Sequence, residues 1–338
     1  DSIVALDIKT GERQWHYQLT HHDIWDWDIP AAPVISDLPN GEKVLMSVTK
    51  QSWIYTFDRE TGEPIWPIEE QPVPAGDVPG EWYSTTQPIP TKPPPFDRQG
   101  FTEEDLIDWT PEIHALALEA TEGFRLAPSV YSPPSLANAE DGTRGTLSLP
   151  SSTGGANWEG AAMDPETGII YVPSRTALAV MALGKDEDSD LDLSAAFGVR
   201  VPRVQGLEIV KPPYGRITAI DMNTGEHQWM IANSDTPDRI KNHRLLEGIE
   251  IERTGIPTRS GVLVTKSLLF VGEGTGGPGA SPIFRAVDKA TGDILAEIDL
   301  PNNQSGLPFT YEHDGKQYLA MFVSGGGQAA QLVAYALP

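Results

Sequence analysis

Three stretches of the chain repeat one pattern: DIKTGERQW at residues 7–15, DRETGEPIW at 58–66 and DMNTGEHQW at 221–229. The first five positions, Asp-x-x-Thr-Gly, occur twice more, at 164–168 and 288–292. Asp and Thr side chains cap tight turns, and Gly adopts the positive φ that such turns require. The residues on either side of each turn are therefore expected to pair as antiparallel strands. We interpret Trp15, Trp66 and Trp229 as core packing residues at equivalent places.

Runs of β-forming residues between these turns group into four-stranded antiparallel units, which is typical of β-propeller blades. We predict an all-β fold with one partial β-propeller domain over residues 1–338, and we expect the chain to be part of a longer protein. The expected units are the end of a blade at 1–20, a blade at 26–66, a proline-rich insertion at 67–145, a blade at 150–232 interrupted by an insertion at 176–213, a blade at 255–300 and an incomplete last blade at 304–338. One short helix is expected at 102–109 (TEEDLIDW).

Charge and composition narrow the class of function. The 338 residues include 24 basic and 48 acidic ones, which gives a net charge of −24. Such a surface repels phosphate backbones and argues against nucleic-acid binding. The chain has no cysteine, so disulfides and thiolate metal sites are excluded. The acidic run at 186–193 lacks the central glycine of a calcium-binding loop and is interpreted as a solvated loop.

Several segments carry a family resemblance: HHDIWDWDIPAAP (21–33), TKQSWIYTFDRETG (49–62), STGGANWEGAAMDPETGIIYVPS (152–174), YGRITAIDMNTGEHQW (214–229) and TYEHDGKQY (310–318). Together they resemble the pyrroloquinoline-quinone (PQQ) dependent dehydrogenases, most closely the branch with membrane-bound glucose and quinate dehydrogenases. The resemblance implies an eight-bladed ring, of which this chain would form about half. It also implies PQQ and Ca²⁺, or another divalent or lanthanide ion, as cofactors, with the metal ligands mostly in the preceding part of the protein.

The same resemblance implies the activity and the site. The substrate would be a sugar, polyol or cyclic alcohol, and ubiquinone or a cytochrome would accept the electrons. Asp26 would be the general base while a hydride passes to PQQ, and Lys50 would stabilise negative charge on the quinone oxygens. Asn157 and Trp158 match a cofactor-binding segment. The resemblance implies a periplasmic location, with membrane attachment through a preceding segment left open, and no metal ligand is assigned within this chain.

Strand topology gives a separate reason to group these four residues. In a blade with strands A to D, the A–B and C–D turns lie on one face and the B–C and D–A connections on the other. The Asp-x-x-Thr-Gly turns occupy A–B or C–D positions. Asp26 lies in a D–A connection, Lys50 in a B–C connection, and Asn157 and Trp158 in the next D–A connection. All four are therefore expected on the opposite face from the repeated turns.

Several residues, and the class of function itself, also admit other interpretations. Asp23 and Asp28 are interpreted as capping or positioning groups. His21 and His22 point to opposite faces of an extended segment, so structural hydrogen bonding is favoured over a shared metal site. A non-catalytic scaffold propeller would need only the repeats, and a carbohydrate-binding or hydrolytic propeller would use paired carboxylates. If the dehydrogenase hypothesis holds, the isolated chain is expected to be inactive.

Overall fold

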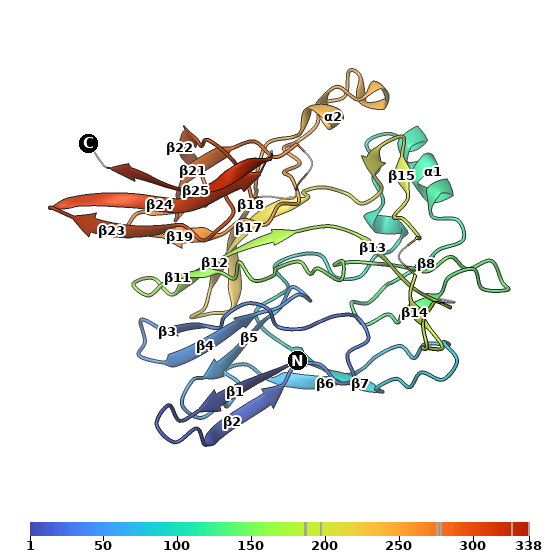
Figure 1. Cartoon of the computed structure of the whole chain (residues 1–338), viewed down its shortest axis with the longest axis horizontal. Coiled ribbons are helices and arrows are strands. Elements are labelled where there is room, and N and C mark those ends of the chain that lie inside the picture. Colours follow the sequence, from blue (N-terminus) through green and yellow to red (C-terminus); the bar gives the residue numbers. More distant parts are fainter. Residues whose placement is uncertain (186–187, 197, 275–276, 278, 326, 337–338) are drawn as a thin grey trace.

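The computed structural model describes residues 1–185, 188–196, 198–274, 277, 279–325 and 327–336. Five antiparallel sheets follow one another along the chain and fan out on one side of the molecule (Figure 1). The first pairs β1 (Ser2–Leu6) with β2 (Arg13–Gln18), and the second holds β3 (Val34–Asp37), β4 (Lys43–Val48) and β5 (Ile54–Asp58). The third holds β11 (Ala162–Asp164), β12 (Ile169–Arg175), β17 (Gly215–Asp221) and β18 (Glu226–Ala232). The fourth holds β19 (Val262–Val264), β20 (Leu268–Gly272), β21 (Ile283–Asp288) and β22 (Ile294–Asp299), and the fifth β23 (Phe309–His313), β24 (Lys316–Gly325) and β25 (Gln328–Ala336).

This arrangement confirms the predicted all-β fold of serial antiparallel sheets, with a two-stranded first sheet and a three-stranded last one. The second sheet differs from expectation. The segment EPIWPI (63–68) was expected to be its fourth strand, but it contributes only an isolated bridge between Phe57 and Pro64. Pro64 and Pro67 have no backbone N–H to donate to a ladder, which explains why no regular strand forms.

Each repeated tryptophan packs against the turn of the following sheet. Trp15 lies over Gly62, where an added Cβ would be 2.6 Å from the indole ring, and its Nε1 donates to the carbonyl of Arg59 at 3.3 Å. At Gly225 an added Cβ would be 3.2 Å from the Trp66 ring, with Lys92 slightly nearer, and at Gly292 it would be 3.1 Å from the Trp229 ring, beside Ile231. The glycine is needed twice, for its positive φ and for the room that the ring occupies. The repeat therefore joins neighbouring sheets as well as closing hairpins.

The insertions form a separate group of short elements beside the fan (Figure 1). The strands are β6 (Ile68–Pro72), β7 (Thr86–Pro90), β8 (Arg125–Leu126), β9 (Ser135–Leu136), β10 (Thr146–Ser148), β13 (Ala179–Gly184), β14 (Ser194–Ala195), β15 (Arg203–Val204) and β16 (Leu207–Glu208), and the helices are η1 (Glu103–Asp105) and α1 (Pro111–Ala120). Two further short helices, α2 (Asp238–Lys241) and η2 (Arg244–Leu246), lie in the connection between β18 and β19. The helix expected at 102–109 is only the three-residue 3₁₀ turn η1. Residues 186–187 of the acidic run lie outside the described part.

The two end sheets expose apolar side chains. In the last sheet Phe322 pairs directly with Leu332 across the ladder, so both point to one face, and they are 49% and 57% exposed. The opposite face, with Met321 and Val323, packs into the core. Val4 and Leu6 of β1 are exposed in the same manner. Within the described residues, no helix has the length and apolar character needed to cross a bilayer.

Candidate cofactor site

The segment HHDIWDWD folds into a turn set by its first aspartate. The Asp23 carboxylate accepts hydrogen bonds from the backbone N–H groups of Trp25 at 2.9 Å and Trp27 at 2.7 Å. Both indoles are buried, and their Nε1 atoms donate to carbonyls at residues 132 and 130 of the insertion. Between them Asp26 is held at φ +69°, an uncommon conformation for a residue other than glycine. The two buried rings thus leave the Asp26 carboxylate outside, where it is 66% exposed.

Asp23 acts as the capping group that the sequence predicted. Burial raises its pKa above the ordinary aspartate value, although the two backbone hydrogen bonds act in the opposite direction. The negative charges of Asp26 and Asp28 raise the pKa further. The turn therefore concentrates three carboxyl groups within six residues, with one of them largely withdrawn from solvent.

Lys50 brings the cation to this turn. It follows β4, and its side chain is only 6% exposed. The ammonium Nζ lies 3.1 Å from Oδ2 of Asp26, donates to the Asp26 carbonyl at 2.8 Å, and also contacts Oδ1 of Asp28. An ammonium has three N–H donors, so these contacts engage all of them. The structure brings Asp26 and Lys50 into direct contact. Asp28, interpreted from its sequence position as a capping or positioning group, is a second carboxylate in contact with Lys50.

The loop that precedes Asn157 and Trp158 touches Lys50. The backbone N–H of Gly155 donates to the Lys50 carbonyl at 2.9 Å. Gly154, at φ +80°, leaves no room for a Cβ, which would be 2.5 Å from Cγ of Lys50. Asn157 donates from Nδ2 to the Thr153 carbonyl at 2.8 Å, which closes the loop, and the Trp158 indole is 43% exposed. The four residues predicted to share one face thus come from three segments that meet at Lys50.

His21 and His22, at the start of the same turn, both contact side chains of the proline-rich insertion. Nε2 of His21 lies 2.9 Å from Glu70, and Nε2 of His22 lies 2.9 Å from Glu81. The His22 ring also stacks on Trp82 at 3.6 Å between centroids. The hydrogen bond from His22 lowers the pKa of Glu81. The two histidines therefore bind separate glutamates, and no group of three or more His, Asp or Glu that could hold a metal occurs among the described residues.

A second polar centre was not visible in the sequence. Asp97 of the insertion is buried and accepts hydrogen bonds from Ser174 at 2.6 Å and Thr176 at 2.7 Å. Asp97 and its two partners are nearly eighty residues apart in the sequence, and no local motif predicts that they pair. Its consequence is that the insertion is anchored at the end of β12, next to the loop that carries Asn157.

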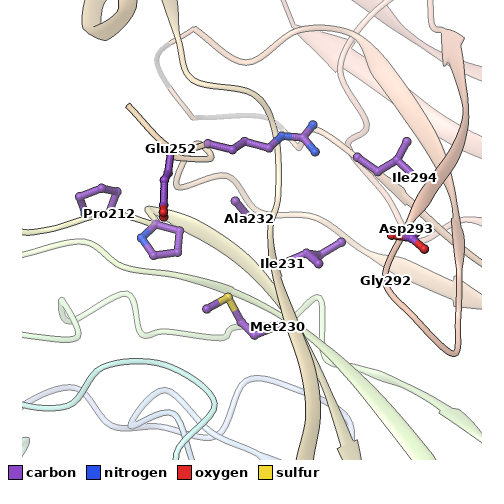
Figure 2. A pocket seen from close by; sticks show the side chains of 10 residues that line it. Pro212, Met230, Ile231, Ala232, Glu252, Gly292, Asp293 and Ile294 are labelled. Carbon is purple, nitrogen blue, oxygen red and sulfur yellow. The ribbon is translucent and has the colours of Figure 1, made fainter. Parts of the chain in front are cut away.

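A cavity of about 510 Å³ lies away from this site (Figure 2). It is formed where the edge strand β18, with Met230 and Ile231, faces Asp293 in the turn before β22 and Ile294 at the start of that strand. The residues that line it include none of the four predicted for the cofactor. This cavity is a groove between neighbouring sheets, beside the turn on which Trp229 docks.

Comparisons with known proteins agree with the fold and the predicted family. Residues 1–319 match the family described as PQQ: glucose/ethanol/alcohol dehydrogenase, β-propeller domain. The chain is 31% identical to a probable quinate dehydrogenase (quinone) from Xanthomonas campestris pv. juglandis, covering 100% of this chain and 45% of that protein. It is 29% identical to quinoprotein glucose dehydrogenase A from Acinetobacter calcoaceticus, covering 100% of this chain and 44% of that protein.

Solved structures show the same fold. A europium-containing methanol dehydrogenase superposes with a TM-score of 0.56 at 21% identity, over 95% of this chain and 44% of that one. A quinohaemoprotein alcohol dehydrogenase from Pseudomonas putida HK5 gives a TM-score of 0.55 at 21% identity, over 96% and 39% of the two chains. The chain spans about half the length of the curated relatives it matches. It belongs to the β-propeller family of PQQ-dependent glucose, ethanol and alcohol dehydrogenases.

Proposed function

We propose that this chain is part of a PQQ-dependent dehydrogenase that oxidises a hydroxyl group of a sugar, polyol or cyclic alcohol. The observation that carries the proposal is the contact between the buried Lys50 ammonium and the exposed Asp26 carboxylate. The names of the relatives, quinate and glucose dehydrogenases, support the substrate class. On the same basis we propose a quinone or cytochrome as electron acceptor and a periplasmic location.

The residues present fit such a cofactor. Lys50 offers an ammonium held in place by two carboxylates, Asn157 an amide, and Trp158 an apolar ring that solvent reaches. When bound, PQQ supplies the acceptor for the hydride of the substrate carbon. Lys50 would exchange one carboxylate contact for a quinone oxygen, and its positive charge would stabilise the negative charge that develops there. We place the ligands of the Ca²⁺, or of another divalent or lanthanide ion, mainly outside this chain.

Asp26 would accept the proton of the substrate hydroxyl. Its Oδ2 faces Lys50, which leaves Oδ1 to receive the proton. The left-handed backbone of Asp26 and the two buried indoles beside it fix the position of its backbone, and the contact with Lys50 orients the carboxylate. A base fixed in this way needs little reorganisation when the substrate arrives.

A matched pair of variants tests the proposal in the full-length protein supplied with PQQ and Ca²⁺. Asp26→Asn keeps the shape of the side chain but removes the base, so we expect kcat for dye reduction to fall by about 10²- to 10⁴-fold. Asp28→Asn removes the other carboxylate that contacts Lys50, and kcat should stay within about tenfold of the wild type. Cofactor binding, followed by quenching of tryptophan fluorescence, should persist in both.

Two outcomes would contradict this assignment. Equal loss in both variants would mean that Asp26 acts only through Lys50. A wild-type protein that neither binds PQQ nor reduces the dye would indicate a scaffold propeller. For the isolated 338 residues we expect no turnover, because the family's ring is proposed to be only half formed.

A further inference from the structure

A second charged group lies directly behind the loop that touches Lys50. Arg175 ends β12, and its backbone N–H donates to the Gly155 carbonyl at 2.8 Å. Its guanidinium Nε donates to the Gly154 carbonyl at 3.3 Å. Because Gly155 donates to Lys50 from its other side, these two glycines separate the Lys50 site from Arg175 by a single layer of backbone.

Arg175 does not act alone. Arg259, in the connection before β19, has its Nε 3.8 Å from Oε1 of Glu159, which follows Asn157 and Trp158 in sequence. Burial, and then the charge of Arg259, lower the pKa of Arg175. Burial raises the pKa of Glu159. Arg259 thus pairs with a buried carboxylate on which the charge of Arg175 also acts, and the Oε1 atom of that carboxylate has no hydrogen-bond partner within the described structure. Positive charge is in excess here, on a chain whose net charge is −24.

The loop that carries Arg259 is held rigidly. The Ser260 hydroxyl accepts a hydrogen bond from Asn233 Nδ2 at 3.1 Å and one from the backbone N–H of Gly274 at 3.3 Å. Gly274 lies so close that an added Cβ would be 1.3 Å from the Arg259 carbonyl oxygen. The backbone that carries Arg259 therefore needs little rearrangement when a ligand binds, which lowers the entropic cost of binding.

The accessible part of this group is Arg259. Its side chain is 35% exposed, whereas that of Glu159 is 6% exposed. The crevice between them and Arg175 measures about 10 Å³, enough for one water molecule, so a larger ligand would meet the rim. Arginine presents its N–H groups in a planar fork that matches a carboxylate.

We propose that Arg259, supported by Arg175 and Glu159, recognises a carboxylate of the molecule bound beside Lys50. The location relies on the proposed function, because Lys50 marks the bound molecule. Two sources share this chemistry: the carboxylates of PQQ, and the carboxylate of a hydroxy-acid substrate. Glu159 and Arg175 are positioning residues in this proposal, and Arg259 makes the contact.

The first experiment measures accessibility and needs no turnover. Phenylglyoxal modifies arginine, and mass spectrometry of the full-length protein would follow Arg259 with and without PQQ, glycerate or its neutral counterpart glycerol. Arg253 is the matched control: it is 33% exposed but already paired with Asp235 at 2.7 Å. Protection of Arg259 by PQQ or glycerate, and not by glycerol, is the expected result. If neither carboxylate protects Arg259, the proposal is overturned, whether or not the protein is a dehydrogenase.

The second experiment separates the two sources with Arg259→Gln and Arg259→Lys. If Arg259 binds a carboxylate of PQQ, Arg259→Gln should weaken PQQ binding about ten- to a hundredfold, as measured by fluorescence quenching. Arg259→Lys should then retain part of the affinity. If Arg259 instead binds a carboxylate of the substrate, Arg259→Gln should bind PQQ with unchanged affinity and should lose its binding of glycerate. Unchanged PQQ affinity together with unchanged glycerate binding in Arg259→Gln would refute the role of Arg259. Failure of wild-type PQQ binding would instead refute the proposed function.

Discussion

Gly154 holds Lys50 in position through the absence of a side chain. Gly154→Ala would have to adopt φ +80° and to displace both the Ala156 carbonyl oxygen and Lys50, because the new Cβ would lie 2.5 Å from that oxygen and from the Lys50 Cγ. We expect PQQ-dependent kcat to fall by at least about tenfold, and the free energy of unfolding by more than the ~1–2 kcal/mol of a left-handed alanine. Gly41→Ala is the control, because Gly41 has φ +90° and open space around it. It should show only the stability loss, and equal kcat values in the two variants would contradict the claim.

For individual residues, the sequence predicted which side chains lie on the same face of the sheets, but not how these side chains are oriented. Strand topology placed Asp26 and Lys50 on one face, and they are in contact. The orientation of Asp26 depends on the cap made by Asp23 and on two indoles that pack against residues 130–132, over a hundred residues away. Such long-range packing leaves no local pattern, and for the same reason the pairing of Arg259 with Glu159 could not be read from the sequence.

Among the elements, neighbouring sheets are joined by a buried ion pair. Nζ of Lys289 lies 2.6 Å from Oδ2 of Asp164, and the two side chains are 12% and 6% exposed. Burial alone would raise the pKa of Asp164, but hydrogen bonds from Lys289 and Thr167 lower it below the ordinary value. Lys289→Met should cost about 1–3 kcal/mol of unfolding free energy, because it removes the cation from a buried carboxylate that keeps only the hydrogen bonds from Thr167 and Glu166. The midpoint of urea unfolding measures the change in unfolding free energy. In the double variant Lys289→Met with Asp164→Asn, part of the lost stability should return, because the buried charge is removed. Equal midpoints for wild type and Lys289→Met would contradict a stabilising role of the ion pair.

The histidine contacts make the insertion sensitive to acid. Hydrogen bonding from His22 lowers the pKa of Glu81, so this contact is complete above the ordinary glutamate value of about 4.3 and is lost as pH falls through the lowered value. The protection factors of residues 21–25 against hydrogen exchange should therefore fall as the pH drops through the lowered pKa of Glu81. Glu81→Gln should remove the part of this acid dependence that comes from the His22 contact, while protonation of Glu70 and Asp23 should still contribute the rest. Asp77→Asn, in the same loop but paired with Arg125, should leave it unchanged, and the reverse pattern would contradict the assignment.

The elements that were mispredicted have physical explanations. Helix α1 was missed although its start carries a recognisable signal: the Thr110 side chain accepts a hydrogen bond from the N–H of Ile113, with Pro111 in the first turn. The fourth strand of the second sheet was expected because its tryptophan fits the repeat, yet its prolines prevent regular pairing. Trp66 still packs against the turn of the next sheet although its own segment forms no strand. The repeat therefore predicts contacts between neighbouring sheets more reliably than it predicts strand pairing.

For the whole molecule, the exposed apolar faces of the end sheets predict self-association of the isolated 338 residues. Leu332 is 57% exposed on the last sheet, and Leu191 is 60% exposed on the insertion. Sedimentation should show that Leu332→Thr reduces association, because the face it shares with Phe322 is the surface that pairs. Leu191→Thr should have no such effect. A monodisperse isolated chain would argue against the proposed half ring.

The most direct test is an experimental structure of the full-length protein with PQQ bound. We predict that a quinone oxygen lies within hydrogen-bond reach of Lys50 Nζ, with the Asp26 carboxylate beside the carbon that receives the hydride. PQQ bound at a place remote from both side chains would contradict the proposal and leave only the propeller scaffold.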